Sequence, residues 1–138
     1  MASNLQSRIL HLPASMPSET SPLSADVYAI RGETAWWIFD VGACDEAVDF
    51  INNLPCDGAA PLKKNIVISH FHRDHFFNLS RVSFDNLFVG RETFRHCDVT
   101  IRARAGVHVV DSPLAIDDGL QIRIEPVPCS HAKGTLVL

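Results

Sequence analysis

The sequence predicts an α/β protein whose strands and helices are layered into a sandwich. Two features of the order of elements indicate this fold class. Apolar runs alternate with segments of helical periodicity in the first two-thirds of the chain, and in the last third the apolar runs are separated only by turns. The 138 residues are 46% hydrophobic and 20% charged, which is typical of one globular domain. We therefore expect a single domain over residues 1–138.

The first elements that the sequence predicts are strands. A short strand over residues 8–12 precedes a loop rich in proline and serine. Apolar runs over residues 27–30 and 34–41 flank a turn that contains Gly32, a pattern typical of a β-hairpin. The second run is apolar on both faces, so it should lie inside the sheet.

The middle of the chain alternates between helices and strands. Helical spacing of apolar residues over 43–54 ends at Pro55. The elements expected next are a strand over 65–69, a short helix over 75–82, a strand over 87–89 and a helix over 91–97. The last third returns to strands over 107–110, 114–116, 120–124 and 135–138, and the turn Asp117-Asp118-Gly119 separates the second from the third.

A cluster of polar residues directly follows the predicted strand 65–69: His70, His72, Asp74 and His75. If the chain is still extended there, residues two apart point to the same side, which places the imidazoles of His70 and His72 together. Neutral imidazole binds zinc and iron. Asp74 and His75 add one oxygen and one nitrogen donor, which suits a second metal ion nearby. So dense a group of donors favours a metal site over separate polar side chains.

The pattern His70-x-His72-x-Asp74-His75 resembles the signature of the metallo-β-lactamase-like hydrolases. Other segments resemble the same family in the same order. The segment FDVG, which contains Asp40, resembles its early Asp-x-Gly, and residues 109–131 resemble its paired strands leading to another ligand histidine, here His131. From about residue 27 to the end, the resemblance implies an αββα sandwich, with the N-terminal half and the start of the second half present.

The resemblance also implies roles for these residues. His70, His72 and His131 would hold a first metal ion, and Asp74 and His75 would hold part of a second. Asp74 would in addition be catalytic by orienting the nucleophile. Asp40 would not bind the metal itself but would hold a ligand side chain or the nearby backbone in place.

The cofactor implied is one or two zinc ions, with iron and manganese as alternatives. The implied function is hydrolysis of an ester, thioester, amide or phosphoester bond of a small molecule by metal-activated water.

The chain departs from the family pattern at its end. The family's second half supplies a later aspartate and a last histidine, and no acidic residue follows His131 before Leu138. We favour a fragment of a longer product over a natural short form that pairs with another chain, or a degenerate relative without catalysis. The alternative function is a non-catalytic or partial metal-binding module that associates with another chain. Strands without partners also favour a homo-oligomer.

A second departure follows the cluster. The family often has two glycines there, whereas this chain has Phe76, Phe77 and Asn78, and we expect the two phenylalanines to pack a helix against the sheet. Cys129 is a weaker ligand candidate, because free cysteine is usually only buried. A hydroxyl beside the cluster, such as that of Ser69, does not make a Ser-His-Asp system.

Charge and composition restrict the partners and the location. A net charge of −4 argues against nucleic-acid binding. The four cysteines match neither zinc-ribbon nor redox spacing, so we expect free thiols in a reducing compartment. No apolar run approaches the length of a membrane span, and no secretory signal is apparent. The expected location is the cytoplasm.

Overall fold

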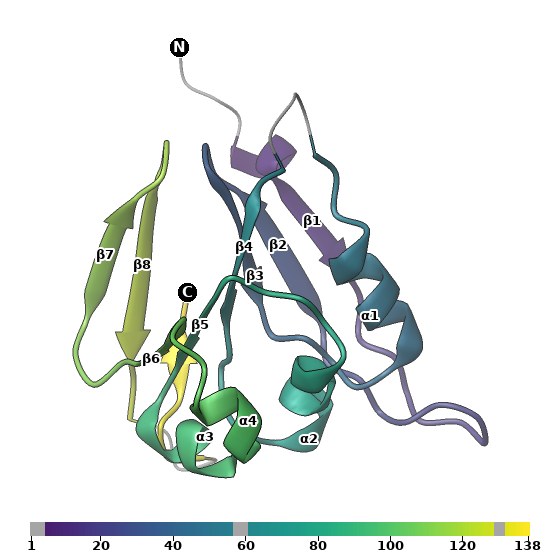
Figure 1. The fold of residues 1–138 in the computed structure, drawn as a ribbon. Helices are drawn as coiled ribbons and strands as arrows, with labels where there is room; N and C mark the ends of the chain where they lie inside the picture. The colour runs from purple at the N-terminus through teal and green to yellow at the C-terminus, as the bar shows by residue number, and fades with distance from the viewer. Residues whose placement is uncertain (1–4, 57–60, 129–131) are drawn as a thin grey trace.

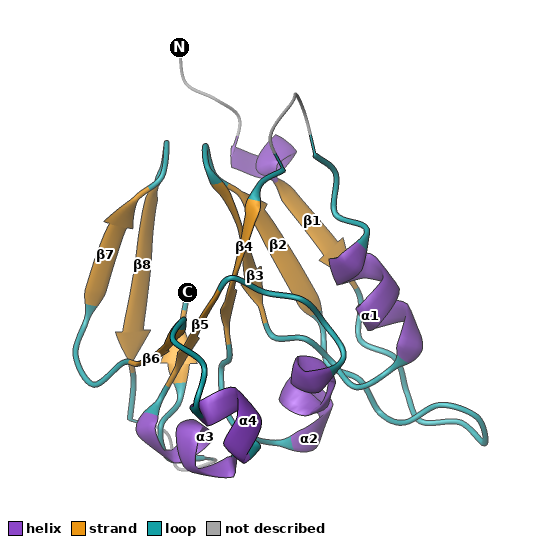
Figure 2. Ribbon diagram, viewed as in Figure 1, coloured by secondary structure: helices purple, strands orange, loops and turns teal. Residues whose placement is uncertain are grey.

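The computed structural model describes residues 5–56, 61–128 and 132–138, which form three layers (Figures 1 and 2). A layer of helices covers one face of a six-stranded sheet, and a three-stranded sheet packs on its other face. Among the described residues, no helix covers the outer face of the smaller sheet. The α/β sandwich predicted from the sequence is confirmed, with three of the four αββα layers in the described chain.

The strands are β1 (Ile9–Leu12), β2 (Val27–Arg31), β3 (Ala35–Phe39), β4 (Lys63–Val67), β5 (Asn86–Val89), β6 (Val107–Val109), β7 (Leu114–Asp117), β8 (Gln121–Pro126) and β9 (Leu136–Val137). The helices are α1 (Asp45–Asn52), α2 (Arg73–Phe76), α3 (Arg91–His96) and α4 (Val99–Arg102), with 3₁₀ turns η1 (Leu5–Arg8) and η2 (Phe77–Ser80). None of these helices is long and apolar enough to span a membrane.

The larger sheet has the order β1-β2-β3-β4-β5-β6. Its first two pairings are antiparallel and the next three are parallel, so β3 to β6 all end at the same edge. The smaller sheet, β7-β8-β9, is antiparallel throughout. The carboxyl ends of parallel strands are where open α/β sheets bind ligands, so this edge is the first place to look for a site.

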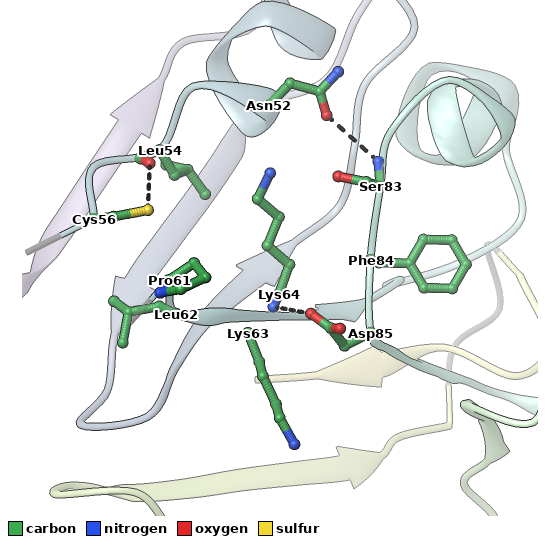
Figure 3. Close-up of a pocket in the computed structure, with 10 residues that line it drawn as sticks. All are labelled: Asn52, Leu54, Cys56, Pro61, Leu62, Lys63, Lys64, Ser83, Phe84 and Asp85. Atoms are coloured by element: carbon green, nitrogen blue, oxygen red, sulfur yellow. Dashed lines mark hydrogen bonds between the residues drawn. The ribbon is translucent and has the colours of Figure 1, made fainter. Parts of the chain in front are cut away.

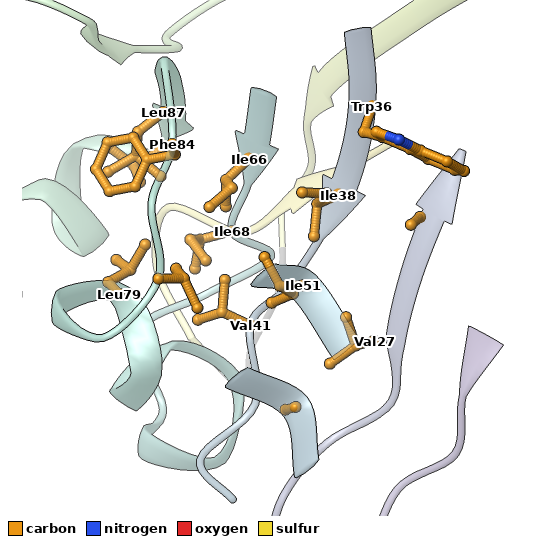
Figure 4. Packing of buried hydrophobic residues seen from close by; sticks show 14 of the residues in the cluster. Val27, Trp36, Ile38, Val41, Ile51, Ile66, Ile68, Leu79, Phe84 and Leu87 are labelled. Carbon is orange, nitrogen blue, oxygen red and sulfur yellow. The ribbon is translucent and has the colours of Figure 1, made fainter. Parts of the chain in front are cut away.

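Strand β3 contributes to two hydrophobic cores, as its apolar sequence predicts. Trp36 and Ile38 face the helices, where they pack with Ile51 of α1 and with the neighbouring strands (Figure 4). Ala35 and Trp37 face the smaller sheet. The alternation of a strand's side chains between the two faces accounts for this division.

The helix expected over residues 75–82 is partly wrong, since α2 begins at Arg73 and gives way to η2 at Phe77. The break has a tertiary cause in the fully buried Asn78. Its Nδ2 donates to the carbonyls of Val41 (3.0 Å) and Cys44 (2.9 Å), and its backbone N–H donates to the carbonyl of Gly42 (3.2 Å). These bonds to the loop after β3 replace helical ones. The short α4, capped by a side chain, was not predicted.

Asp118 joins the turn between β7 and β8 to the turn between β2 and β3. Its carboxylate accepts hydrogen bonds from the backbone N–H (2.8 Å) and hydroxyl (2.7 Å) of Thr34 and from Nε1 of Trp37 (2.9 Å). Glu33 N–H donates to its backbone carbonyl (2.8 Å). Burial raises the pKa of Asp118. The hydrogen bonds from Thr34 and Trp37 together lower it by more than burial raises it, so the pKa lies below the ordinary 3.8.

The link through Asp118 should make stability depend on pH. Because the folded protein lowers this pKa, the contribution is fully present above pH 3.8, the ordinary value, and is lost as pH falls below it and through the lower pKa of the folded protein. We expect Asp118→Asn to reduce the free energy of unfolding at neutral pH by about 1–3 kcal/mol, because an amide cannot accept all three bonds. Urea denaturation over a pH series measures this difference.

The matched control for this variant is Asp117→Asn, which removes the same charge from the exposed neighbouring residue. We expect its stability to follow that of the wild type. If Asp118→Asn lost as much stability at about pH 3 as at neutral pH, the ionised carboxylate would not be the source of the stabilisation.

Candidate metal centre

The predicted ligands that the structure describes lie in a loop and a short helix at the carboxyl edge of the larger sheet. Asp40 follows β3 directly, and its backbone N–H donates to the carbonyl of Val67 in β4 (2.9 Å). Helix α2 carries Asp74 and His75, and their carbonyls accept from the backbone N–H groups of Ala25 and Val41 (both 2.9 Å). Backbone bonds from two other segments therefore hold the cluster in place.

The prediction that His70 directly follows an extended strand is wrong, because β4 ends at Val67. The backbone N–H of Ser69 donates to Oδ1 of Asp40 (2.7 Å) and not to a neighbouring strand. The rings of His70 and His72 are nevertheless adjacent, with centroids 4.8 Å apart and planes at 74°. The predicted proximity of the two imidazoles is thus found.

Asp40 is almost completely buried and has a positive φ of 64°. Aspartate tolerates this left-handed conformation better than most residues do, and such conformations cluster at functional sites. Besides the Ser69 N–H, the carboxylate accepts from the Ser69 hydroxyl (2.8 Å) and from Nδ1 of His75 (2.7 Å). The supporting role that the resemblance implies for Asp40 stays a prediction, and these are the contacts through which Asp40 would act.

These hydrogen bonds determine which nitrogens of the histidines carry protons. A carboxylate can only accept, so Nδ1 of His75 carries a hydrogen. The single hydroxyl proton of Ser69 is donated to Asp40, so the Ser69 oxygen accepts from Nδ1 of His70 (2.9 Å). In the neutral form, both imidazoles then have their lone pair on Nε2. This is how a supporting acceptor prepares a histidine to bind metal through Nε2.

Asp74 and His75 are spaced as two ligands of one ion would be. Oδ2 of Asp74 lies 3.4 Å from Nε2 of His75. Two donors about 2.0–2.1 Å from a tetrahedral zinc are separated by about 3.3 Å. The rings of His70 and His75 are also close, with centroids 4.1 Å apart.

The pKa of His75 reflects this acidic setting. Burial lowers it, but the hydrogen bond and charge of Asp40, together with the charges of Asp74 and Asp26, raise it above 6.5 overall. A proton and a metal ion would therefore compete for Nε2.

The donor chemistry fits a metal ion, since imidazole nitrogens and a carboxylate oxygen are what zinc and iron bind. Within residues 5–56, 61–128 and 132–138, no three histidine, cysteine or acidic side chains are gathered closely enough to hold an ion. Two predicted candidates, His131 and Cys129, lie outside the described residues. The described donors are thus His70, His72, Asp74 and His75.

Ser69 contacts several residues of the candidate site, and the sequence did not identify it as part of that site. Its hydroxyl bridges Asp40 and His70, and it lies 3.4 Å from Nδ1 of His75. It forms no Ser-His-Asp system, because its proton is donated to Asp40. In the sequence, the only indication of its role was its position at the end of the predicted strand, directly before His70.

The aromatic residues after the cluster differ in environment. Phe76 packs against the core on the helix side, as expected. The same expectation for Phe77 is wrong, because 43% of this residue is exposed and the guanidinium of Arg73 lies over its ring at 4.3 Å. Phe71, between the first two histidines, stacks on His96 with centroids 4.0 Å apart. Phe71 also meets the ring of His72 edge-on, with centroids 5.2 Å apart.

No protein-family model matches this sequence, and no curated protein matches it. Solved structures do resemble the fold. Rubredoxin:oxygen oxidoreductase from Desulfovibrio gigas is 16% identical with a TM-score of 0.68, and the match covers 99% of this chain and 37% of that one. A B3 metallo-β-lactamase with an active-site glutamic acid is 15% identical with a TM-score of 0.60, covering 80% and 48%.

A flavo-diiron protein variant from Thermotoga maritima is 14% identical with a TM-score of 0.57, and the match covers 80% of this chain and 29% of that one. The chain thus spans about half or less of the length of these structures. At such low identity the likeness establishes the architecture, in agreement with the sequence motifs. The chain has the metallo-β-lactamase fold.

Proposed function

We propose that this chain belongs to a metal-dependent hydrolase that cleaves an ester, thioester, amide or phosphoester bond of a small molecule. The observation that carries the proposal is the buried hydrogen-bond network of Asp40, Ser69, His70 and His75. This network orients two imidazoles and leaves the lone pair of each neutral ring on Nε2. A merely structural cluster would not require both rings to share that tautomer.

In this proposal His70, His72 and His131 hold a first ion, and Asp74 and His75 contribute to a second. The strand that follows His131 lies beside the cluster, because the N–H of Leu136 donates to the carbonyl of Ser69 (2.8 Å). This contact supports the inclusion of His131 in the first ligand set.

We expect zinc, since histidine nitrogen with carboxylate oxygen is a common zinc ligand set. Iron binds the same donors, and the flavo-diiron structures of similar fold make it the second candidate, ahead of manganese. Metal analysis of purified protein distinguishes the three.

When bound, the metal would lower the pKa of a coordinated water and polarise the oxygen of the substrate. The residues of this chain provide the positioning. Asp40 holds the His75 ring, and Ser69 holds the His70 ring. Asp74 presents a carboxylate that can accept a proton or a hydrogen bond from the attacking water, and its backbone is fixed by the bond from Ala25. Little reorganisation is then needed during the reaction.

The overall test is hydrolysis of generic ester, thioester and phosphodiester substrates before and after treatment with a chelator. Loss of activity on chelation and recovery on adding zinc or iron would support a metallohydrolase. Bound metal without hydrolysis of any of these bonds would favour the alternative, a non-catalytic metal-binding module. Absence of bound metal would contradict both functions.

The ligand assignment predicts a loss of metal in His72→Ala. We expect the purified variant to contain at least one ion fewer per chain than the wild type, as measured by plasma mass spectrometry, because an alanine provides no donor. His108→Ala is the control, since this exposed histidine lies on β6, away from the cluster. Equal metal contents in wild type and His72→Ala would contradict the assignment.

The network predicts that Asp40→Asn weakens metal binding roughly 10- to 100-fold, the usual effect of removing a residue that supports a ligand. Asparagine also tolerates a positive φ, so the backbone at 64° should be retained. Zinc affinity measured by competition with a chromogenic chelator checks this result.

Ser69→Ala removes the hydroxyl that bridges Asp40 and His70 but keeps the hydrogen bond between His75 and Asp40, so we expect a smaller loss of zinc affinity than in Asp40→Asn. Unfolding curves without metal show whether either loss comes from instability. Zinc affinities equal to wild type in both variants would show that the network does not support the ligands.

A further inference from the structure

A cavity of about 170 Å³ lies in the layer of helices, between α2 and η2 on one side and α3 and α4 on the other. Most of its lining is apolar and comes from Phe76, Phe77, Leu79, Cys97 and Ile101. A protein cavity of about 150 Å³ with leucine, isoleucine and phenylalanine in its wall binds benzene. The space between these helices is therefore large enough for one uncharged ring.

Buried core residues form the inner wall of the cavity. Leu79, Cys97 and Ile101 are almost completely buried and belong to the core on the helix side of the larger sheet, where Figure 4 shows Leu79. The Cys97 thiol donates to the carbonyl of Thr93 (3.3 Å), and burial raises its pKa to about 11. The thiol therefore stays protonated at neutral pH and presents a neutral surface. A wall made of packed core residues has little freedom to close the space.

Apolar side chains also lie at the opening of the cavity. Phe77 is 43% exposed, and Val99, which follows the lining residue Asp98, is 65% exposed. Exposed apolar surface around a hollow is typical of a binding site for a ligand.

The polar residues of the lining do not call for a charged ligand. The carboxylate of Asp98 accepts from the N–H (2.9 Å) and the hydroxyl (3.0 Å) of Thr100 at the start of α4. Nδ1 of His96 lies 2.9 Å from the carbonyl of Glu92 and donates to it. The hydroxyl of Ser80 belongs to an exposed residue, where water can bond to it. The lining thus favours an uncharged apolar group, which needs no hydrogen-bond partner.

The cavity adjoins the candidate metal centre. The ring of His96, which belongs to the lining, stacks on Phe71 with centroids 4.0 Å apart, and Phe71 meets the ring of His72 at 5.2 Å. On the other side of the cavity, Phe76 directly follows His75 in the chain. One aromatic ring thus separates the lining from a proposed ligand. A molecule bound at the metal could extend a group past that ring into the cavity.

We propose that this cavity binds an uncharged apolar group of about the size of a phenyl ring, and that this group is the non-reacting part of the substrate. The second statement rests on the proposed hydrolase function, whereas the first does not. Binding of a non-reacting group would let the enzyme select among substrates that contain the same bond.

Binding is tested with toluene and chelator-treated protein, so that neither metal nor hydrolysis is needed. NMR follows the methyl signals of Leu79 and Ile101, which line the cavity. We expect these signals to shift and saturate with millimolar toluene.

The variant that tests the location is Ser80→Phe, which places a ring in the cavity from an exposed position. We expect toluene binding to weaken at least about ten-fold, because the new ring takes the space of the ligand. Ser83→Phe is the matched control. It makes the same change at an exposed serine of the larger pocket in Figure 3, at the opposite end of the parallel strands, and should leave toluene binding unchanged.

The role in substrate selection is tested with two substrates that differ only in a benzyl group in place of a methyl group beside the cleaved bond. Relative to hydrolysis by hydroxide, we expect wild-type kcat/KM to be at least about ten-fold higher for the benzyl substrate. Ser80→Phe should remove this preference and keep kcat/KM for the methyl substrate. Ser83→Phe should keep both.

The binding site is overturned if toluene leaves the Leu79 and Ile101 signals unshifted, or if the two serine variants weaken binding equally. Bound toluene with equal kcat/KM for the two substrates overturns the assignment to the substrate. If the wild type hydrolyses none of the bonds, the proposed function fails, and the toluene titration still decides the site. If Ser80→Phe does not fold, the wild-type titration and the pair of substrates still decide both statements.

Discussion

The candidate site depends on one buried carboxylate, that of Asp40. Its two oxygens accept three hydrogen bonds, from the backbone and hydroxyl of Ser69 and from the ring of His75. Asp40 directly follows β3, and its backbone N–H donates a hydrogen bond to β4. A single side chain therefore ends the regular pairing of β4, turns the chain toward His70 and orients a second histidine from α2. Without it, the loop after β4 would have no partner for the Ser69 N–H.

Local patterns in the sequence predict much of the fold. The hairpin of β2 and β3, helix α1 and the turn at Gly119 each depend on residues close together in the chain, so period and turn chemistry are sufficient signals. The end of β4 and the break between α2 and η2 could not be predicted in this way. Both are set by side chains from distant segments, Asp40 and Asn78, whose hydrogen bonds replace those of regular structure.

Part of the candidate site could likewise be predicted from local sequence patterns, and part could not. The spacing of the histidines indicated that His70 and His72 would be neighbours, and the rings are adjacent even though the strand ends early. The contribution of Ser69 depends on the position of Asp40, which is 29 residues away in sequence. No local sequence pattern indicates a contact between residues so far apart in the chain. Serine is also common in loops, so its type alone carries little information.

The positive φ of Asp40 has a consequence for how this protein can change. Most residues are disfavoured in that conformation, and β-branched or bulky ones most strongly. A replacement must therefore tolerate the backbone, be short enough for the buried space and still accept hydrogen bonds. Asparagine alone among the common residues approaches all three conditions, and it lacks the charge. Few substitutions are therefore tolerated at this position, and a change in the properties of the candidate site has to come from the residues around it.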